Sequence, residues 1–557
     1  MSTTKRRKVI LVSVLAGLFL LIIAGIICFD AIVTRTVNKR LQAELQADKR
    51  FDASFKSIVV LVGSRTVEVR DITFRMPAAD TAQGIKPAVD LHVDRVSIRQ
   101  INLSRLMKEK YLEIGKIVID EPSVALNLPI AKMEQKEEAG QKPSPLTGVK
   151  VDKIDIDNCS MQLTDAATKL QLSLEDLSLD ACDIGYDLAT STLSYNDSVY
   201  DISLSNLDFI SPDGLYRLCM ESLETKDAGA VVLKQLRCYN TVKKTELADR
   251  LGKVPATWID VSLSKISTSP VNLVRLALSG EIDLDHMDIQ GSKAHIFRDI
   301  RYPPKFPSPM PQEELMAMPM PMRIRTVHMA VPKIDIEMCM LGLESGVIGV
   351  ENVKGTVSNI TNHKGESMHA KMHAALAHGG EGELTASFKM DKASHFDMAA
   401  NFHDVKAASF NTFLHPLFGM EAEFTINELT TSYSGDHICA NGTFCMTYDD
   451  IQARVIKDDT PYSVIAKNAD AINVFAPAVL QRRNPRMPGQ KPQSYEVTKT
   501  RDEMQNAAVY LTGPLLDGVL KTLLPGLVVK IIDQQIDKKA DKKGDKNADK
   551  KAAKQKK

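Results

Sequence analysis

The chain has 557 residues, and its 70 Lys and Arg residues balance its 70 Asp and Glu residues. This length allows roughly three or four domains, and a net charge of zero does not point to a nucleic-acid partner. The eight cysteines are scattered and contain no CxxC pair, which excludes the regular framework of a disulfide-rich domain.

The chain begins with a candidate membrane anchor at 1–30. Residues 9–29 are twenty-one in number and carry no charge, and four basic residues directly precede them. A helix of this length crosses a hydrocarbon core of about 30 Å. Positive charge beside a first span stays in the cytoplasm, so we expect a single-pass membrane protein with a cytoplasmic N-terminus. A cleaved signal peptide fits less well, because the apolar segment is too long and no small-residue cleavage site follows.

After the anchor, the hydrophobic period changes from helical to strand-like. Residues 31–50 predict a linking helix, since apolar residues fall near one face. From residue 51 the sequence alternates, most clearly over Thr66–Met76. Alternation is typical of a half-buried strand, whose successive side chains leave opposite faces. Residues 51–130 are therefore predicted to be a first β-repeat region.

A small apolar pattern recurs, with apolar residues at positions n, n+3 and n+5. The occurrences are Val93/Val96/Ile98, Ile114/Ile117/Ile119, Val151/Ile154/Ile156, Leu174/Leu177/Leu179, Leu204/Leu207/Phe209 and Ile324/Val327/Met329. The step of three followed by two changes the parity of the strand once, which a bend or a β-bulge would accommodate. A repeat of this kind favours an elongated array over one globule.

Helical segments between the strands are few and short, with candidates at Leu103–Lys110, Glu246–Gly252 and Val271–Leu278. The alternating strand and helix spacing of a parallel sheet is missing. We therefore predict a mainly β protein: an N-terminal transmembrane helix followed by an elongated, curled antiparallel β-sheet groove with a few short helices.

Two linkers divide the body. The first is rich in Lys, Glu and Pro, and the second is rich in Pro and Met and is predicted to be extended or turn-rich. The predicted order is a linker at 131–148, a second β-repeat region at 149–301, the Pro/Met-rich linker at 302–322 and a third β-repeat region at 323–508.

The C-terminal part contains an amphipathic stretch and a charged tail. Residues 509–533 are predicted to form an amphipathic helix that lies on a membrane or on the sheet end, because its charges argue against a second span. It is a candidate docking element for an outer-membrane or other envelope protein, and the alternative is that it only caps the terminal strands. The candidate docking residues are Leu516, Leu520, Leu523 and Leu524. Residues 534–557 are Lys-rich and are predicted to be disordered.

No catalytic motif is present, since the sequence lacks GxxxxGK[ST], GxSxG and HExxH. His369 and His373 are expected on the wet face of a strand, and His415-Pro416 in a turn. We also interpret Asp180, Asp183 and Asp187 as solvated loop acids, so that no enzyme activity, metal site or cofactor is predicted. A disulfide between Cys219 and Cys238 across a hairpin is left open.

The apolar side of such a sheet must be covered, either by a second sheet or by a ligand in a trough. Lipid is the natural ligand for a protein tied to a membrane. Moving a two-chain lipid through water exposes on the order of 30 methylenes at about 0.8 kcal/mol each, over 20 kcal/mol in all. The candidate groove residues share positions in the repeat: Ile117, Ile119, Ile154, Ile156, Leu177, Leu179, Val327 and Met329.

The anchor, the β-rich body and repeats such as Leu112–Val124 resemble the AsmA-like family of envelope proteins, which includes TamB. The segments 346–362 and 448–451 and the residues Arg482-Arg483-Asn484-Pro485 are similar to members from Bacteroidetes-type bacteria. The resemblance implies a periplasmic groove protein of the inner membrane that moves phospholipid to the outer membrane and supports outer-membrane biogenesis and integrity. The family has no catalytic residues to transfer to this chain.

A second hypothesis explains the same strands differently. Stacked sandwich domains with closed, dry cores would form a membrane-anchored scaffold or assembly factor for outer-membrane proteins, without lipid transport. A third, an anchored hydrolase, has no motif in its favour.

Overall fold

A computed structural model describes most of the body of the protein. The described residues are 52–61, 65–76, 79–81, 84–86, 88–127, 146–165, 168–188, 192–194, 200–226, 229–271, 276, 280–340, 344–456, 469–470, 473–474 and 480–523. The predicted anchor, the linking helix, most of the 131–148 linker, most of Val271–Leu278, Leu524 and the Lys-rich tail lie outside these residues.

The described chain is mainly β, with a few short helices, which confirms the predicted class. The strands are β1 (Asp52–Ser54), β2 (Ser57–Leu61), β3 (Thr66–Met76), β4 (Ala79–Thr81), β5 (Gly84–Lys86), β6 (Ala88–Ile101), β7 (Tyr111–Asp120), β8 (Ser123–Asn127), β9 (Gly148–Thr164), β10 (Gln171–Asp187), β11 (Thr192–Ser194), β12 (Tyr200–Ile210), β13 (Tyr216–Lys226), β14 (Ala230–Asn240), β15 (Ala256–Pro270), β16 (Ile282–Asp299), β17 (Met322–Cys339), β18 (Ser345–Thr361), β19 (Ser367–Leu376), β20 (Glu381–Lys389), β21 (Phe396–Lys406), β22 (Met420–Gly435), β23 (Cys439–Val455) and β24 (Ser494–Thr500). The helices are α3 (Leu103–Glu109), α4 (Leu247–Arg250), α6 (Pro311–Met316), α7 (Ala408–Phe418), α9 (Ala507–Leu511) and α10 (Gly513–Leu523).

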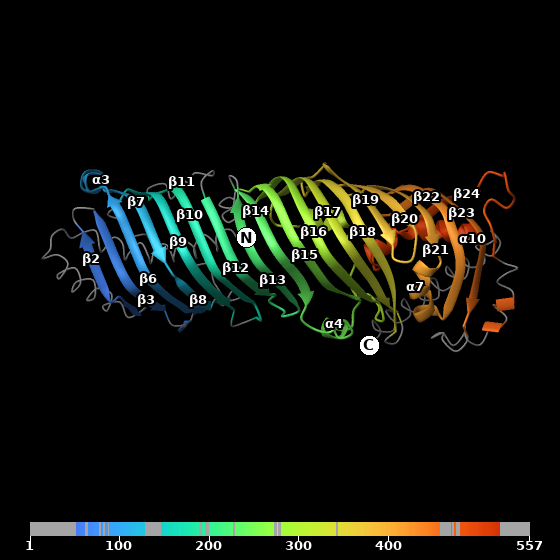
Figure 1. The fold of residues 1–557 in the computed structure, drawn as a ribbon, viewed down its shortest axis with the longest axis horizontal. Helices are drawn as coiled ribbons and strands as arrows, with labels where there is room; N and C mark the ends of the chain where they lie inside the picture. Colours follow the sequence, from blue (N-terminus) through green and yellow to red (C-terminus); the bar gives the residue numbers. More distant parts are fainter. Residues whose placement is uncertain are drawn as a thin grey trace, which may run out of the picture. The chain divides into compact units, whose positions relative to one another are not determined.

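The chain forms two compact units, whose boundary passes through β15, β16 and β17. The first unit takes Met1–Lys243, Ile259–Ser292 and Met320–Ile324, and the second takes Lys244–Trp258, Lys293–Pro319 and Arg325–Lys557. Figure 1 shows the strands and helices of both and labels most of them.

The sheet of the first unit is mixed, whereas the sequence led us to expect an antiparallel one. Most neighbours are antiparallel, from β2–β3 and β3–β6 to β13–β14 and β14–β15. However, β9 pairs in parallel with both β7 and β8. Glu121 and Pro122 interrupt the extended segment and separate β7 from β8. The long connection between β8 and β9 lets the chain return, so that β9 runs beside both strands in the same direction.

The second unit contains a regular antiparallel succession. Strand β18 pairs with β19, and each later strand pairs with the next through β23–β24. Most of these strands follow one another through short connections, which gives a meander, whereas α7 lies between β21 and β22 and a longer connection precedes β24.

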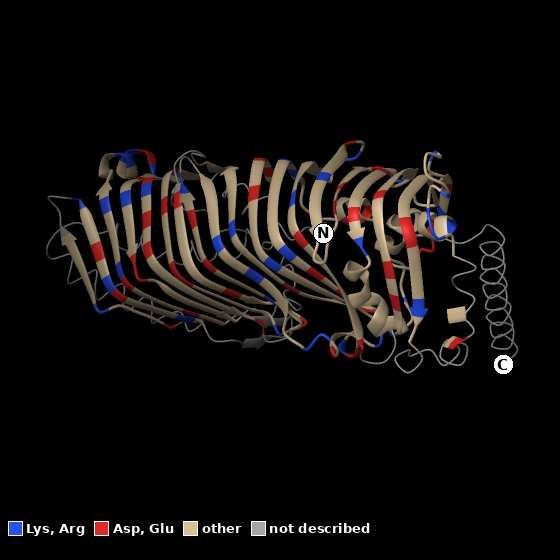
Figure 2. Cartoon of the chain, turned by 45° about the vertical axis from the view of Figure 1, so that its right-hand side comes forward, with Lys and Arg blue, Asp and Glu red and all other residues tan. Residues whose placement is uncertain are grey.

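Most described strands longer than ten residues bend part-way along their length (Figure 2). The cause is visible in the backbone: Asp71, Asn158, Asp176 and Asn206 have φ between 49° and 55° although they lie within strands. Short Asp and Asn side chains tolerate this left-handed conformation best among the non-glycine residues. The register shifts of β10 against β9 and β12 fall at or beside these residues, as expected for bulges that bend a sheet.

Several local predictions are confirmed and others are wrong. Strand β3 has the predicted bounds, and α3 and α4 lie within the predicted helices. His415 and Pro416, interpreted as a turn, lie inside α7. The 302–322 linker contains the helix α6, which begins with Pro311 at its first turn, where proline costs no hydrogen bond. Asp180, Asp183 and Asp187 belong to β10 rather than to a loop.

Three hydrophobic clusters are buried. One lies among β2, β3, β6, β7 and β9, with Leu103 and Leu106 of α3 packed against it. The other two lie in the second unit. One joins β20–β23 to α6 and α9, and the other joins β21–β24 to α7 and α10. No helix of the described residues is long and apolar enough to span a membrane, and the predicted span at 9–29 lies outside them.

Candidate functional site

Strand register arranges apolar residues into continuous rows across the first unit. Each member of a row is paired with the next across neighbouring strands. One row is Val69, Val96, Ile119, Ile156, Leu179 and Ile202; a second is Val67, Ile98, Ile117, Ile154 and Ala181; a third is Leu163, Leu172, Phe209, Leu218, Cys238 and Val261; a fourth is Leu204, Leu223, Leu233 and Ile266. These rows define an apolar face, and paired apolar side chains stabilise it.

The structure brings most of the predicted groove residues together on this face. Ile119, Ile156 and Leu179 share the first row, Ile117 and Ile154 share the second, and Leu177 is opposite Cys159. Val327 and Met329 lie on β17 in the second unit.

The predicted groove residues differ in exposure. Ile117, Ile119 and Val327 are buried, whereas Ile154, Ile156, Leu177, Leu179 and Met329 are half-buried. Only the half-buried group is placed to contact a ligand without displacement of its neighbours.

A contiguous half-buried part of the apolar face lies on β12–β15, and we call it the open stretch. Its members are Ile202, Leu204, Leu207, Phe209, Leu218, Leu223, Leu233, Leu236, Cys238, Val261, Leu263 and Ile266, all half-buried. Sequence reasoning identified only the β12 triad among them. None of them belongs to the three buried clusters formed by the described residues.

Two cysteines mark the two sides of this sheet. Cys238 is paired with Leu218 in the third row, whereas its strand neighbour Arg237 is paired with Cys219. Successive residues of a strand point to opposite faces, so the two thiols lie on opposite sides of the sheet. Both are free, which answers the question of a hairpin disulfide.

The opposite face of the first unit is charged. Asp155 contacts the ammonium groups of Lys116 and Lys153, and Lys153 also reaches Asp180 at 3.2 Å. On β12 and β13 the Arg217 guanidinium donates two hydrogen bonds to Asp208, at 2.7 and 2.6 Å. The bonds from Arg217 outweigh the cost of burial and lower the pKa of Asp208. Figure 2 shows acidic and basic residues interspersed along these strands.

In the second unit, helices cover apolar side chains of the strands. Phe396, Phe444, Met446, Tyr448 and Val497 are each at most 2% exposed. The residues that pack against these clusters include Leu315 and Met316 of α6, Tyr510 and Leu511 of α9, and Leu515, Val519 and Leu523 of α10. We call this region, on β20–β24, the covered end.

The predicted docking residues separate into two groups on α10. Leu516 and Leu520 are 54% and 49% exposed, and Val509 of α9 is 41% exposed. Leu523 instead packs inward against β23 and β24, together with Leu515 and Val519. The helix therefore caps the strands with one side and presents an apolar stripe with the other.

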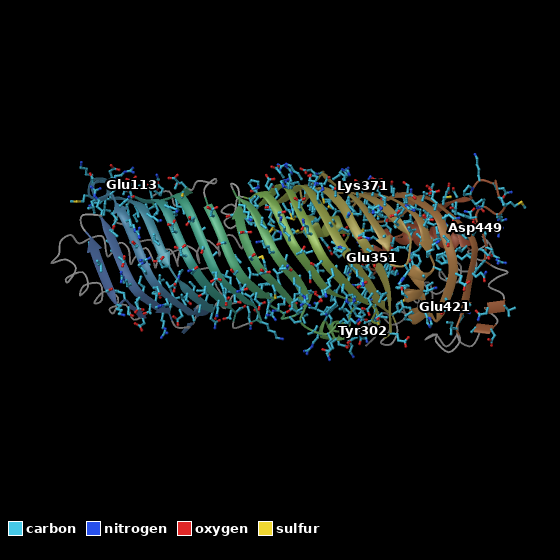
Figure 3. All side chains as sticks on the ribbon, in the orientation of Figure 1. Glu113, Tyr302, Glu351, Lys371, Glu421 and Asp449 are labelled. Atoms are coloured by element: carbon cyan, nitrogen blue, oxygen red, sulfur yellow. The ribbon has the colours of Figure 1, made fainter. Side chains whose placement is uncertain are left out.

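Charged residues of the second unit lie on strand faces and ends away from the buried clusters. Figure 3 labels Lys371, which contacts Glu383 at 2.6 Å, and Glu421 near α7, which contacts His415 at 3.4 Å. His369 and His373 lie on strand β19 and alternate with Ala370 and Met372, as predicted. Among the described residues, no group of three or more His, Cys, Asp or Glu side chains could hold a metal ion.

Comparison with known proteins adds no identity. No protein-family model matches the chain, and no curated protein matches it. The feature of the structure that points to a function is the apolar face of the first unit.

Proposed function

We propose that the protein is an AsmA-like inner-membrane protein whose apolar face holds the acyl chains of phospholipids and conducts them between the inner and outer membranes. The segment 9–29 anchors it, and the body lies in the periplasm. The observation that carries the proposal is the open stretch on β12–β15.

An open apolar face of this size needs a partner. Twelve half-buried apolar side chains form it, and the strands also have a charged side with internal ion pairs. Soluble proteins rarely leave a large contiguous apolar patch exposed unless something binds there. Acyl chains fit because they require burial and no specific polar contact.

The energetics agree with a passive role. A phospholipid that crosses water unaided exposes roughly 30 methylenes, and this hydrophobic cost of about 20 kcal/mol is most of the barrier. A continuous row of apolar residues removes that cost without catalytic groups. No further chemistry is required of the face.

The test uses the full chain reconstituted into vesicles. One variant keeps only Cys238 and a second keeps only Cys219, and each is labelled with a fluorescent maleimide. Phospholipid brominated on its acyl chains should quench the probe at Cys238, because bromine quenches only near contact. The probe at Cys219, on the charged face of the neighbouring strand, is the matched control and should keep its intensity.

Extraction of the detergent-purified chain provides a second measurement. The proposal expects phospholipid bound in at least stoichiometric amount. Equal quenching at both cysteines together with an absence of extracted phospholipid would refute it.

The alternative is a membrane-anchored scaffold for envelope proteins. The covered end favours it, because a closed apolar core is what a scaffold domain needs. The open stretch does not, since a scaffold would leave it uncovered. Lack of bound lipid combined with an intact fold would favour the scaffold.

A further inference from the structure

The covered end is closed by side chains that fit it closely. A methyl group added at Gly518 of α10 would lie 2.1 Å from Cγ of Phe444, so the helix backbone rests directly on that ring. Close approach of this kind requires glycine. Phe444 and Met446 are each 1% exposed as a result.

Buried hydroxyl groups hold the helices in this position. Tyr433 donates to the carbonyl oxygen of Leu511 of α9 at 2.8 Å, and Tyr448 donates to that of Thr522 of α10 at 3.3 Å. Tyr510 donates to the carbonyl oxygen of Asp436 at 2.8 Å. Removing the helices would break these bonds, and each buried polar group left unpaired costs about 1–3 kcal/mol.

The helix α6 completes the closure from a distant part of the chain. Gln312, fully buried, donates to the carbonyl oxygen of Ser394 at 2.8 Å. Arg501, which precedes α9, donates to the carbonyl oxygen of Ser308 at 2.8 Å. Three helices from two separate segments are therefore fastened to the same strands.

We infer that α6, α9 and α10 form a permanent plug, so that acyl chains bind to the open stretch on β12–β15 but never to the apolar side chains of β20–β24. The inference rests on the proposed function. Its consequence is that the apolar side chains of β20–β24 take no part in holding lipid.

Photo-leucine incorporated throughout the full chain tests this with little change of shape. After illumination in phospholipid vesicles, mass spectrometry locates the lipid adducts. We expect adducts at the half-buried leucines of the open stretch, such as Leu223 and Leu233, and none at Leu429 and Leu511 of the covered end. Adducts in both regions would overturn the plug and leave the proposed function standing. Adducts in neither region would overturn both.

A disulfide lock gives an independent measurement. A Cβ at Gly513 would lie 2.5 Å from Cγ of Lys499, so Gly513→Cys with Lys499→Cys places two thiols within bonding reach. The oxidised protein should capture lipid at the same leucines as the reduced one. Loss of capture on oxidation, restored by reductant, would show that α10 opens during loading and would overturn the inference.

Discussion

The carboxylate of Asp517 accepts a hydrogen bond from the backbone N–H of Thr498 at 3.0 Å, on strand β24. One turn later Lys521 donates to the carbonyl oxygen of Glu496 at 2.9 Å and to Asp517 at 2.8 Å. Two side chains of α10 therefore satisfy backbone groups of β24 that its partner strand β23 does not take up. An unpaired edge strand would otherwise be a template for association with another chain.

The double substitution Asp517→Ala with Lys521→Ala should expose these backbone groups. We expect the free energy of unfolding to fall by roughly 1–2 kcal/mol, because charged hydrogen bonds are lost, and self-association to increase. Denaturant titration and analytical ultracentrifugation measure the two effects. Lys491→Ala, which removes an exposed charge before β24, is the control and should change neither.

The two sides of α10 should respond differently to charge. Leu516→Asp with Leu520→Asp changes exposed side chains and should cost less than about 1 kcal/mol of stability. Leu515→Asp with Val519→Asp places charge against the buried cluster and should cost on the order of 3 kcal/mol or more.

The same pair of variants tests docking in cells. If the exposed stripe binds an envelope partner, the Leu516/Leu520 variant should be abundant but should fail to support outer-membrane integrity. Normal abundance together with normal integrity would exclude a docking role for the stripe.

At strand residues with the left-handed backbone conformation, stability should depend on the shape of the side chain and not on its charge. Asp176 is exposed and has φ of 49° within β10. Asp176→Val should destabilise the protein by about 1–2 kcal/mol, because a β-branched side chain is strained in that conformation. Asp176→Gly relieves the strain and should be close to neutral. Thermal unfolding of the two variants makes the comparison, and equal losses would contradict the role assigned to this residue.

Glu337 of β17 should make part of the stability pH-dependent. Burial opposes its ionisation, but hydrogen bonds from Lys244 at 2.7 Å, Ser345 and His295 at 2.7 Å outweigh it and lower the pKa of the carboxyl group. A lowered pKa means that the stabilisation is complete above the ordinary pKa of glutamate and is lost as the pH falls through the folded-state pKa.

Glu337→Gln should therefore lower the free energy of unfolding at neutral pH by roughly 3 kcal/mol, because the Lys244 ammonium loses the buried carboxylate that it contacts. The difference from the natural protein should shrink as the pH is lowered through the acid range. Denaturant titrations at neutral and acid pH measure it, and a difference that is constant with pH would rule out this assignment.

Much of the local structure could be predicted from the sequence, because alternation and helix signals are local. Thr66–Met76 forms the predicted strand, and the apolar triads lie on the predicted kind of bent strand. In two of the triads a short polar residue occupies position n+2, namely Asp176 and Asn206, and both adopt the left-handed conformation. These residue types favour that conformation, so the sequence also indicates the positions of these two bends.

Tertiary structure alone decided which apolar residues are open and which are covered. Ile117 and Leu223 both lie on strands of the first unit, yet the first is buried in a cluster against which α3 packs and the second is half-buried. Leu516 and Leu523 lie in one amphipathic stretch, yet only the second faces the strands. Whether a side chain is buried depends on which distant segment of the chain packs against it. The helix α6, for example, contacts Ser394 through Gln312, 82 residues away along the chain, and no local sequence pattern encodes that contact.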